Sequence, residues 1–336
     1  MQIETPYLLF LGDVGDQLAA KTAHGIVDWR PEWCIGQLRL EGCKADCNIA
    51  DMTPAEAAAK GVRTMIVGVV NAGGVLPEHW ITEIVAAMDA GMDVATGLHR
   101  RLRDVPEIAD ASERNGCKLH DVRFSDQIFQ TGKGDKRSGM RLLTVGTDCS
   151  VGKKYTSLAL EKEMRRRGMN ADFCATGQTG VFISGRGVSI DAVVADFISG
   201  AAEWLSPDND PDHWDVIEGQ GSLFHPSFAG VTLGLLHGSQ PDAFVVCHEP
   251  TRTNMRGVKH SLPSIADVIE RVNLEASLTN PDAQCIGLAV NTVALDDAAA
   301  SACLEEIGTQ HGLPCVDPIR TGCGPIIDEL QRRFPG

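Results

Sequence analysis

The segment 140–167 constrains the fold of this chain most strongly, because a strand, a glycine-rich loop and a helix are expected to follow one another in it. The apolar run Met140–Val145 predicts a strand, and the pattern of Lys153–Arg167 predicts a helix. This order is typical of a phosphate-binding loop, in which glycines let backbone N–H groups point inward and the start of the helix adds positive potential. The residues predicted to bind a phosphate-bearing cofactor are Gly146, Thr147, Asp148, Cys149, Ser150, Val151, Gly152, Lys153 and Lys154.

Two departures from the commonest phosphate loop limit its chemistry. Five residues separate Gly146 from Gly152, one more than in the commonest form. Lys154 stands where a Ser or Thr hydroxyl usually holds Mg²⁺ beside a triphosphate. The sequence therefore favours phosphate binding without Mg-ATP hydrolysis. The alternative interpretation is an ordinary glycine turn before a helix, with Lys153 exposed.

Short apolar runs alternate with helical patterns on both sides of this loop. In the first half, Thr64–Val70 reads as a strand and Glu78–Ala90 as a helix, whereas 131–139 has the polar, glycine-rich composition of a linker. A chain of 336 residues also exceeds what one core usually holds. We therefore predict an α/β fold with two doubly wound domains, a Rossmann-like domain over 1–135 and a P-loop NTPase-like domain over 140–336. Further strands are expected at Tyr7–Leu11, Asn170–Ala175, Asp215–Ile217, Ala243–Cys247 and Cys285–Val290, and further helices near Ser264–Leu274, Asp296–Gly308 and Pro325–Arg333.

The composition argues against several classes of function. Lys and Arg number 30 and Asp and Glu number 45, so the net charge of −15 repels nucleic acid phosphates and anionic membrane surfaces. The apolar stretches are far shorter than the ~20 residues that span a bilayer. The eleven cysteines include no C-x-x-C pair, so neither a disulfide framework nor a metal site is expected. We expect a cytoplasmic homo-oligomer that binds small-molecule substrates and neither nucleic acid nor membranes.

The phosphate loop resembles that of dethiobiotin synthetase and its relatives, and two further segments agree with this. Asp215-Val-Ile-Glu-Gly-Gln-Gly-Ser222 is similar to the strand-end Glu-Gly-x-Gly of that class, in which the Glu faces the phosphates. Asn291-Thr292 is similar to the place where that class meets the nucleotide base. The resemblance implies that Asn291 also binds the cofactor. It leaves an ATP-dependent ligase or synthetase as one alternative function.

Taken whole, the chain resembles a bacterial two-domain family, the DgcN-type D-glutamate N-acetyltransferases. The matching segments are Leu11–Asp16, Ala20–Ala23, Gly146–Cys149 with Val151–Lys153, Ala175–Gly180, Ile217–Ser222 and His248–Arg252. This resemblance implies transfer of the acetyl group of acetyl-CoA to the amine of D-glutamate, within D-amino-acid catabolism. A phosphate loop without its Mg²⁺-binding hydroxyl fits CoA, whose phosphates are bound but not hydrolysed. A non-catalytic nucleotide-binding regulator is the second alternative.

Acetyl transfer requires a deprotonated amine, so a general base is expected where strands of the sheet end. Glu218 and His248 each follow an apolar run, and His225 lies shortly after Glu218. Each of the three could accept the proton, and the sequence does not choose between them. For each histidine, a hydrogen-bonded structural imidazole is the alternative interpretation.

A dicarboxylate substrate requires cations. Arg252, Arg256 and Lys259 follow closely after His248, and Arg186 lies between two glycines. Guanidinium groups bind carboxylates in a bidentate manner. We therefore predict that these four cations bind the substrate, with ordinary surface charge as the alternative.

Overall fold

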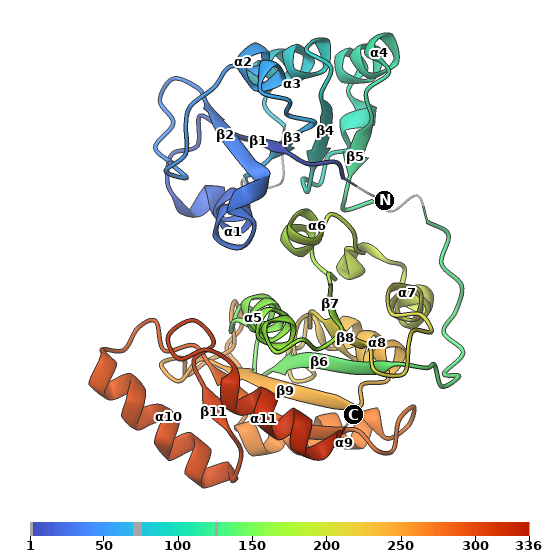
Figure 1. Ribbon diagram of the computed structural model, residues 1–336, viewed down its shortest axis with the longest axis vertical. Coiled ribbons are helices and arrows are strands. Elements are labelled where there is room, and N and C mark those ends of the chain that lie inside the picture. Colours follow the sequence, from blue (N-terminus) through green and yellow to red (C-terminus); the bar gives the residue numbers. More distant parts are fainter. Residues whose placement is uncertain (1–2, 70–75, 125–126, 336) are drawn as a thin grey trace. The chain divides into compact units, whose positions relative to one another are not determined.

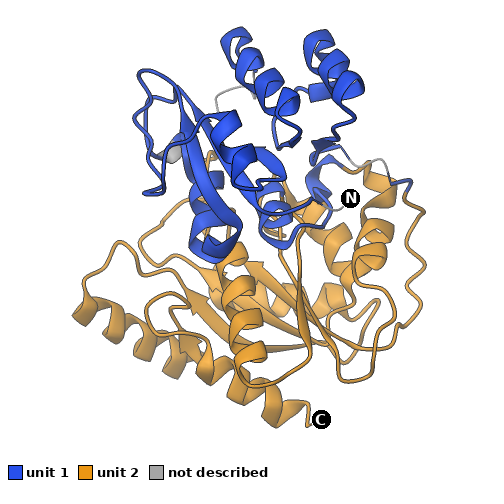
Figure 2. Cartoon of the chain, turned by 45° about the horizontal axis from the view of Figure 1, so that its top comes forward, with its two compact units in different colours: residues 1–128, 178–192 blue, residues 129–177, 193–336 orange. Residues whose placement is uncertain are grey.

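The chain forms two compact α/β units, each with a parallel sheet, as the sequence predicts. Unit 1 comprises residues 1–128 and 178–192, and unit 2 comprises residues 129–177 and 193–336 (Figure 2). The computed structural model describes residues 3–69, 76–124 and 127–335.

Unit 1 is built on a five-stranded parallel sheet with the strand order β2-β1-β3-β4-β5 (Figure 1). Helices α2, α3 and α4 lie together on one side of this sheet, and α1 packs against α6 on the other. Strand β1 is buried along its whole length, which explains why it reads as a continuous apolar run. The elements are β1 (Tyr7–Gly12), α1 (Lys21–Trp29), β2 (Cys34–Arg39), α2 (Pro54–Ala59), β3 (Thr64–Val67), α3 (Glu78–Asp89), β4 (Asp93–Thr96), α4 (Pro106–Asn115), β5 (Leu119–Asp121) and α6 (Gln178–Ser184).

Unit 2 is built on a six-stranded parallel sheet with the order β11-β10-β9-β6-β8-β7. Helices α5 and α11 pack together on one side of the sheet, and α7, α8 and α9 form a continuous layer on the other (Figure 1). The elements are β6 (Met140–Gly146), α5 (Lys153–Arg166), β7 (Ala171–Cys174), α7 (Ile198–Leu205), β8 (Trp214–Ile217), α8 (Ala229–Ser239), β9 (Ala243–His248), α9 (Ile265–Ala276), β10 (Gln284–Val290), α10 (Asp297–His311), β11 (Cys315–Val316) and α11 (Gly324–Arg333).

The segment 178–192 belongs to unit 1, although it lies beyond the linker in the sequence. Tyr7 Oη donates to the carbonyl of Phe182 at 3.5 Å, and the Ile3 N–H donates to the carbonyl of Gly185 at 3.1 Å. The Ser189 hydroxyl donates to the carbonyl of Val122 at 2.9 Å. The structure therefore divides the chain differently from the two segments 1–135 and 140–336. Contacts between residues far apart in sequence cause this difference.

Most of the predicted strands and helices are found near their predicted positions. No counterpart among the predictions exists for strands β2 and β11 or for helices α2, α4, α6, α7 and α8. The predicted strand Thr64–Val70 ends in the structure at Val67, and Val70 lies outside the described residues.

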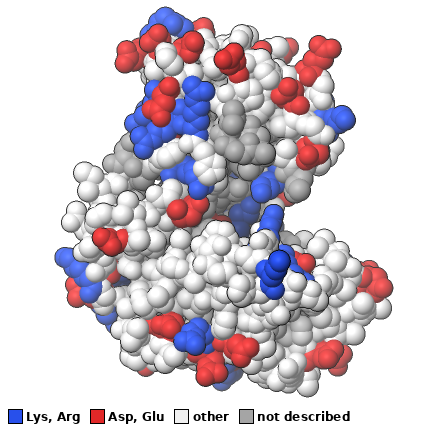
Figure 3. All heavy atoms as spheres, turned by 180° about the vertical axis from the view of Figure 1, so that it is seen from behind, with Lys and Arg blue, Asp and Glu red and all other residues white. Residues whose placement is uncertain are grey.

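On the face shown in Figure 3, acidic and basic side chains are interspersed, with large uncharged areas between them. On this face the acidic excess does not gather into one continuous patch.

Candidate active site

The carboxyl end of β6 is the place where the strand order of unit 2 reverses. After β6 the chain builds β7 and β8 on one side, and it then builds β9, β10 and β11 on the other. Ligands of open parallel sheets bind at such a switch point, outside the carboxyl ends of the strands. Thr147 follows β6 directly and His248 ends β9, so both lie at this position.

The predicted phosphate loop forms here. It leaves β6 at Gly146 and enters α5 at Lys153. Ser150 and Gly152 both have left-handed backbones, with φ of 56° and 107°. At Gly152 this conformation favours glycine, which explains the glycine directly before the helix. The structure thus provides the strand, loop and helix start that an anion site requires.

Lys153 is buried, with 7% of its surface exposed. Its Nζ donates to the Asp148 carbonyl at 2.7 Å, so the ammonium lies inside the curve of the loop. Burial lowers the pKa of Lys153. An anion bound by the loop would restore the balance of charge around this ammonium.

No hydroxyl of α5 replaces the missing Mg²⁺ ligand. Lys154 occupies that position, and its Nζ lies 4.8 Å from the centre of the Tyr155 ring. The next aliphatic hydroxyl on the helix, that of Thr156, is buried and accepts a hydrogen bond from the Cys247 thiol at 3.4 Å. This arrangement agrees with a loop that binds phosphate groups without hydrolysing a metal-bound triphosphate.

Asp148 connects the phosphate loop to the segment after β9. Its side chain is fully buried. Oδ2 accepts hydrogen bonds from Arg252 Nη1 and from the Arg256 backbone N–H, each at 2.7 Å. Oδ1 accepts from the Cys149 N–H, also at 2.7 Å. A buried carboxylate needs such partners, and the Arg252 guanidinium supplies the opposite charge.

Arg252 and Arg256, predicted to bind substrate, are both bonded to the phosphate loop. Arg252 Nη1 also donates to the Cys149 carbonyl at 2.7 Å, and Nη2 is paired with Glu249. Arg256 Nη1 donates to the Ser150 hydroxyl at 2.6 Å. The geometry therefore gives both arginines a role in holding the loop.

The other two predicted substrate cations, Lys259 and Arg186, lie in different units of the chain. Lys259 is exposed in unit 2, on the segment that follows β9. Arg186 belongs to unit 1. Their role in substrate binding stays a prediction.

Glu218 follows β8 and is buried, with 4% of its surface exposed. Its Oε2 accepts hydrogen bonds from the backbone N–H groups of Thr176 and Gly177, each at 3.1 Å. Burial raises the pKa of Glu218, while Lys154 and these two N–H groups oppose that rise. The carboxyl group of Glu218 thus anchors the segment that immediately precedes α6. Its role as general base stays a prediction.

His225 is also buried, and both of its ring nitrogens have partners. Its Nδ1 accepts from the Ser227 N–H at 3.2 Å, so this nitrogen carries no proton. Nε2 therefore carries the proton and donates to the Arg256 carbonyl at 3.0 Å. With both nitrogens engaged, His225 fits the structural interpretation better than the role of general base.

His248 has the geometry that a general base requires. It is half-buried at the end of β9, and its Nδ1 lies 3.2 Å from Thr147 Oγ1. Its Nε2 has no hydrogen-bond partner among the residues that the structure describes. Burial lowers the pKa of His248, so its imidazole is neutral near pH 7 and can accept a proton.

Asn291 follows β10, beside the end of β9. Its N–H donates to the His248 carbonyl at 2.8 Å, and its side-chain oxygen accepts from the Val293 N–H at 3.2 Å. Next to it, the buried Asp317 accepts hydrogen bonds from the Thr292 hydroxyl and N–H. Asn291 therefore lies on the same edge of the sheet as the phosphate loop. The resemblance to the dethiobiotin synthetase class would place the base of a nucleotide there.

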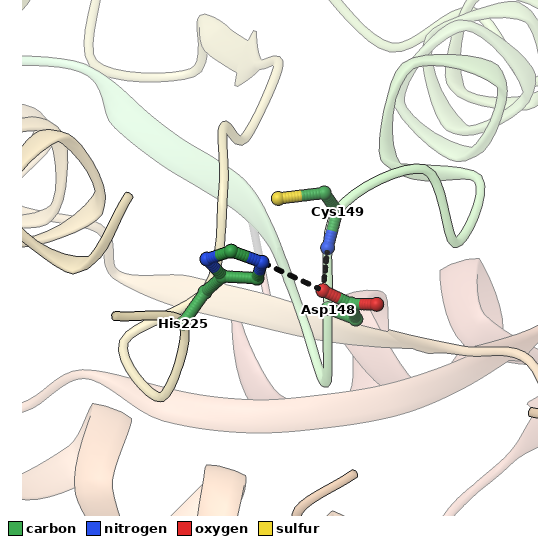
Figure 4. Close-up of side chains that lie close together, drawn as sticks. All are labelled: Asp148, Cys149 and His225. Atoms are coloured by element: carbon green, nitrogen blue, oxygen red, sulfur yellow. Dashed lines mark hydrogen bonds and ion pairs between the residues drawn. The ribbon is translucent and has the colours of Figure 1, made fainter. Parts of the chain in front are cut away.

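Asp148, Cys149 and His225 form a cluster that sequence reasoning did not identify (Figure 4). The Cys149 sulfur, a ring nitrogen of His225 and a carboxylate oxygen of Asp148 all lie within 4.8 Å of one another. Such a set could hold a metal ion. However, both carboxylate oxygens already accept hydrogen bonds, and the Arg252 guanidinium lies 2.7 Å from Oδ2. A metal cation would have to compete with that guanidinium for Asp148.

One signal in the sequence pointed to the pairing of Asp148 with an arginine. An acidic residue inside an anion-binding loop requires a cation close to it, and Asp148 is such a residue. The arginines after His248 were the available partners. These arginines were expected to bind a substrate, so the ion pair between Arg252 and Asp148 was not predicted.

Comparisons with known proteins agree with this architecture. Residues 128–327 match a family model described as a domain of unknown function, DUF1611, with a P-loop, and residues 38–125 match its Rossmann-like N-terminal counterpart. A crystal structure of a DUF1611 family protein from Anabaena variabilis has a TM-score of 0.86 and 29% sequence identity to this chain. That comparison covers 98% of this chain and 100% of the other.

Two curated relatives match this chain over nearly its full length. They are D-glutamate N-acetyltransferases from Tritonibacter scottomollicae and from a Pseudoalteromonas species, and each is 51% identical to this chain. Each match covers 98% of this chain, with 99% of the first relative and 100% of the second. Among the described residues, no helix has the length and apolar character needed to cross a membrane.

Proposed function

Because this chain belongs to the DUF1611 family, we propose that it transfers the acetyl group of acetyl-CoA to the amine of D-glutamate. One observation carries this proposal: two D-glutamate N-acetyltransferases share 51% of their residues with this chain over 98% of its length. Because the similarity extends over both domains, it favours a reaction common to this chain and the two relatives. The proposed enzyme is an acyltransferase of D-amino-acid catabolism that acts on small molecules in the cytoplasm.

The phosphate loop is proposed to bind the phosphate groups of acetyl-CoA. Its backbone N–H groups and the start of α5 offer positive potential, and Lys153 adds one full charge. Lys154 replaces the Mg²⁺-binding hydroxyl, which supports a cofactor that is held and not hydrolysed. No metal is part of this proposal.

His248 is proposed to remove a proton from the ammonium group of D-glutamate. Its neutral imidazole has one nitrogen held near Thr147, and no residue in the described part of the chain is bonded to the other. Deprotonation leaves a lone pair on the amine, which can attack the acetyl carbonyl carbon.

A thiol-release assay tests the proposed function. The purified chain is given acetyl-CoA with D-glutamate, with L-glutamate or without an amine, each with and without Mg-ATP. We expect CoA thiol release that depends on D-glutamate and persists without Mg-ATP and in EDTA. Mass spectrometry of the product should identify N-acetyl-D-glutamate.

The assay also separates the alternatives. Strict dependence on Mg-ATP would point to a ligase of the dethiobiotin synthetase type. Tight nucleotide binding without turnover of any amine would point to a regulator. Either result would contradict the proposed acetyl transfer.

A further inference from the structure

A basic segment follows strand β4 of unit 1. It is Gly97-Leu-His-Arg-Arg-Leu-Arg103, which contains three arginines, one histidine and no acidic residue, in a chain whose net charge is −15. The segment lies at the carboxyl end of β4, and ligands of parallel sheets bind at that edge. Such a concentration of positive charge there favours an anionic ligand.

The backbone of this basic segment is fixed to the end of strand β5. Asp121 is the last residue of β5 and is buried. Its Oδ1 accepts a hydrogen bond from the Leu102 N–H at 2.7 Å, and its Oδ2 accepts one from Arg103 Nε at 3.3 Å. The side chains of Leu98 and Leu102 are also buried. The segment is therefore held at both of its leucines.

The cations between the two leucines remain available to a ligand. His99, Arg100 and Arg101 are all exposed. Among the residues that the structure describes, no carboxylate is paired with any of them. In this they differ from Arg252 and Arg256, whose guanidinium groups are bonded to the phosphate loop of unit 2.

An aromatic ring holds the side chain of Arg101 in place. The guanidinium carbon lies 4.4 Å from the centre of the Phe124 ring. The Phe124 N–H donates to the Asp121 carbonyl at 2.7 Å, so the ring belongs to the same strand end as the anchor of the segment. A guanidinium over the face of a ring can direct its N–H groups outward, where they can bind a carboxylate in a bidentate manner. Arg101 is thus preorganised for a carboxylate ligand.

The basic segment also lies close to the switch point of the unit 1 sheet. The chain builds β2 on one side of β1, and it builds β3, β4 and β5 on the other (Figure 1). The strand order therefore reverses between β1 and β3, which is where an open sheet binds its ligand. Strand β4 pairs with β3, so only one strand spacing, about 4.8 Å, separates them.

We propose that Arg100 and Arg101 bind the γ-carboxylate of D-glutamate and thereby select a dicarboxylate substrate. This inference rests on the proposed function, because D-glutamate must be the acetyl acceptor. The phosphates of acetyl-CoA are assigned to the loop of unit 2, and the arginines of unit 2 that were expected to bind the substrate hold that loop instead. The carboxylates of the amino acid are thus the anions of the reaction that still require cations. An amino acid with an uncharged side chain would leave both arginines without a partner, which favours D-glutamate over such substrates.

The experiment measures steady-state kinetics of the full chain with both substrates varied. Arg101→Ala should raise the KM for D-glutamate by about ten- to a hundred-fold, as expected for one lost charge-assisted contact, and leave the KM for acetyl-CoA unchanged. Arg100→Ala should act in the same direction. Arg101→Lys should restore only part of the loss, because an ammonium does not form the bidentate contact. Arg114→Ala is the control and should keep the wild-type constants, since it removes an exposed arginine of unit 1 on α4 that is bonded to Asp89.

Two further measurements identify the group that the arginines bind. D-Glutamine has nearly the shape of D-glutamate but lacks the charge of the γ-carboxylate. The wild type should have a higher KM for D-glutamine than for D-glutamate, and Arg101→Ala should change the KM for D-glutamine little. Phe124→Leu keeps both charges but removes the ring beneath Arg101, so it should raise the KM for D-glutamate less than Arg101→Ala does.

The possible outcomes separate this inference from the proposed function. A folded Arg101→Ala variant with the wild-type KM for D-glutamate would overturn the inference. A rise confined to the KM for acetyl-CoA would also overturn it, because the arginines would then bind a phosphate of the cofactor. Both results leave the proposed function intact, since the wild type would still acetylate D-glutamate. A wild type that transfers no acetyl group to D-glutamate would instead overturn the proposed function.

Discussion

Nδ1 of His248 lies 3.2 Å from the hydroxyl oxygen of Thr147, and this contact joins the ends of two neighbouring parallel strands. Thr147 directly follows β6, and His248 is the last residue of β9. The contact orients the imidazole ring. When Nδ1 donates to the Thr147 hydroxyl, Nε2 is the nitrogen that can accept a proton.

Replacement of His248 by Gln should lower kcat by about 10²–10⁴-fold, because a positioned general base contributes that much. The wild-type rate should rise from about pH 6 to 8 as the amine loses its proton, and the variant should depend more steeply on pH. His237→Gln is the control, since this half-buried histidine of α8 is bonded to the Glu275 carbonyl. Equal kcat values for wild type and His248→Gln would show that His248 is not the general base.

Lys153→Ala should raise the KM for acetyl-CoA more than the KM for D-glutamate. Loss of one charge-assisted contact of ~1.5–3 kcal/mol weakens binding by roughly ten-fold or more. Lys162→Ala removes an exposed charge from the same helix and is the control. A folded Lys153→Ala variant with the wild-type KM for acetyl-CoA would show that this loop does not bind the cofactor.

Arg252→Ala should damage stability as well as catalysis, because it leaves Asp148 buried without its guanidinium partner. Breaking a buried ion pair from one side costs about 3–5 kcal/mol, and the Arg256 N–H, which stays bonded to Asp148, should keep the loss near the lower value. Arg252→Lys should restore little of either property, since one ammonium cannot reach Asp148 and the carbonyls of Cys149 and Ser150 together. Chemical denaturation measures the effect. A selective rise in the KM for D-glutamate at unchanged stability would instead support the substrate role predicted from sequence.

Glu218→Gln should remove a pH dependence of stability. Burial raises the pKa of Glu218 in the folded chain, so between its unfolded and folded pKa values the folded state holds a proton that the unfolded state has released. The contribution of this carboxyl to stability therefore declines as the pH rises through that range. Melting temperatures of the two proteins should be closest at low pH, and the variant should become relatively more stable toward neutral pH. If the wild type instead became more stable than the variant as the pH rises, the raised pKa of Glu218 would be contradicted.

Sequence reasoning located the elements whose signals are local. Strand β6, the phosphate loop and helix α5 were predicted correctly, because an apolar run, two glycines and a helical pattern lie within one short segment. Helix α8 was missed because it is apolar on all sides: α7 and α9 both pack against it, so it shows no helical period.

The partner of a charged side chain was harder to predict. Arg252 was expected to bind a substrate carboxylate, since its place after His248 puts it at the end of a strand. Besides the nearby Glu249, its carboxylate partner is Asp148, which lies more than a hundred residues earlier in the sequence. No periodicity or spacing links the two, and only the parallel pairing of β6 with β9 brings them together.

The assignment of 178–192 to unit 1 has a consequence for biosynthesis. Helix α6 packs against α1, and Thr22 and Thr179 hydroxyls lie 3.3 Å apart, so unit 1 lacks part of its own packing until residue 192 has left the ribosome. By then β6, α5 and β7 of the other unit have already been translated. The first domain cannot finish folding ahead of the second, as it could in a tandem arrangement. For the same reason, a nascent chain arrested at residue 128 should remain sensitive to protease, and one arrested after residue 192 has emerged should gain protection in its first half.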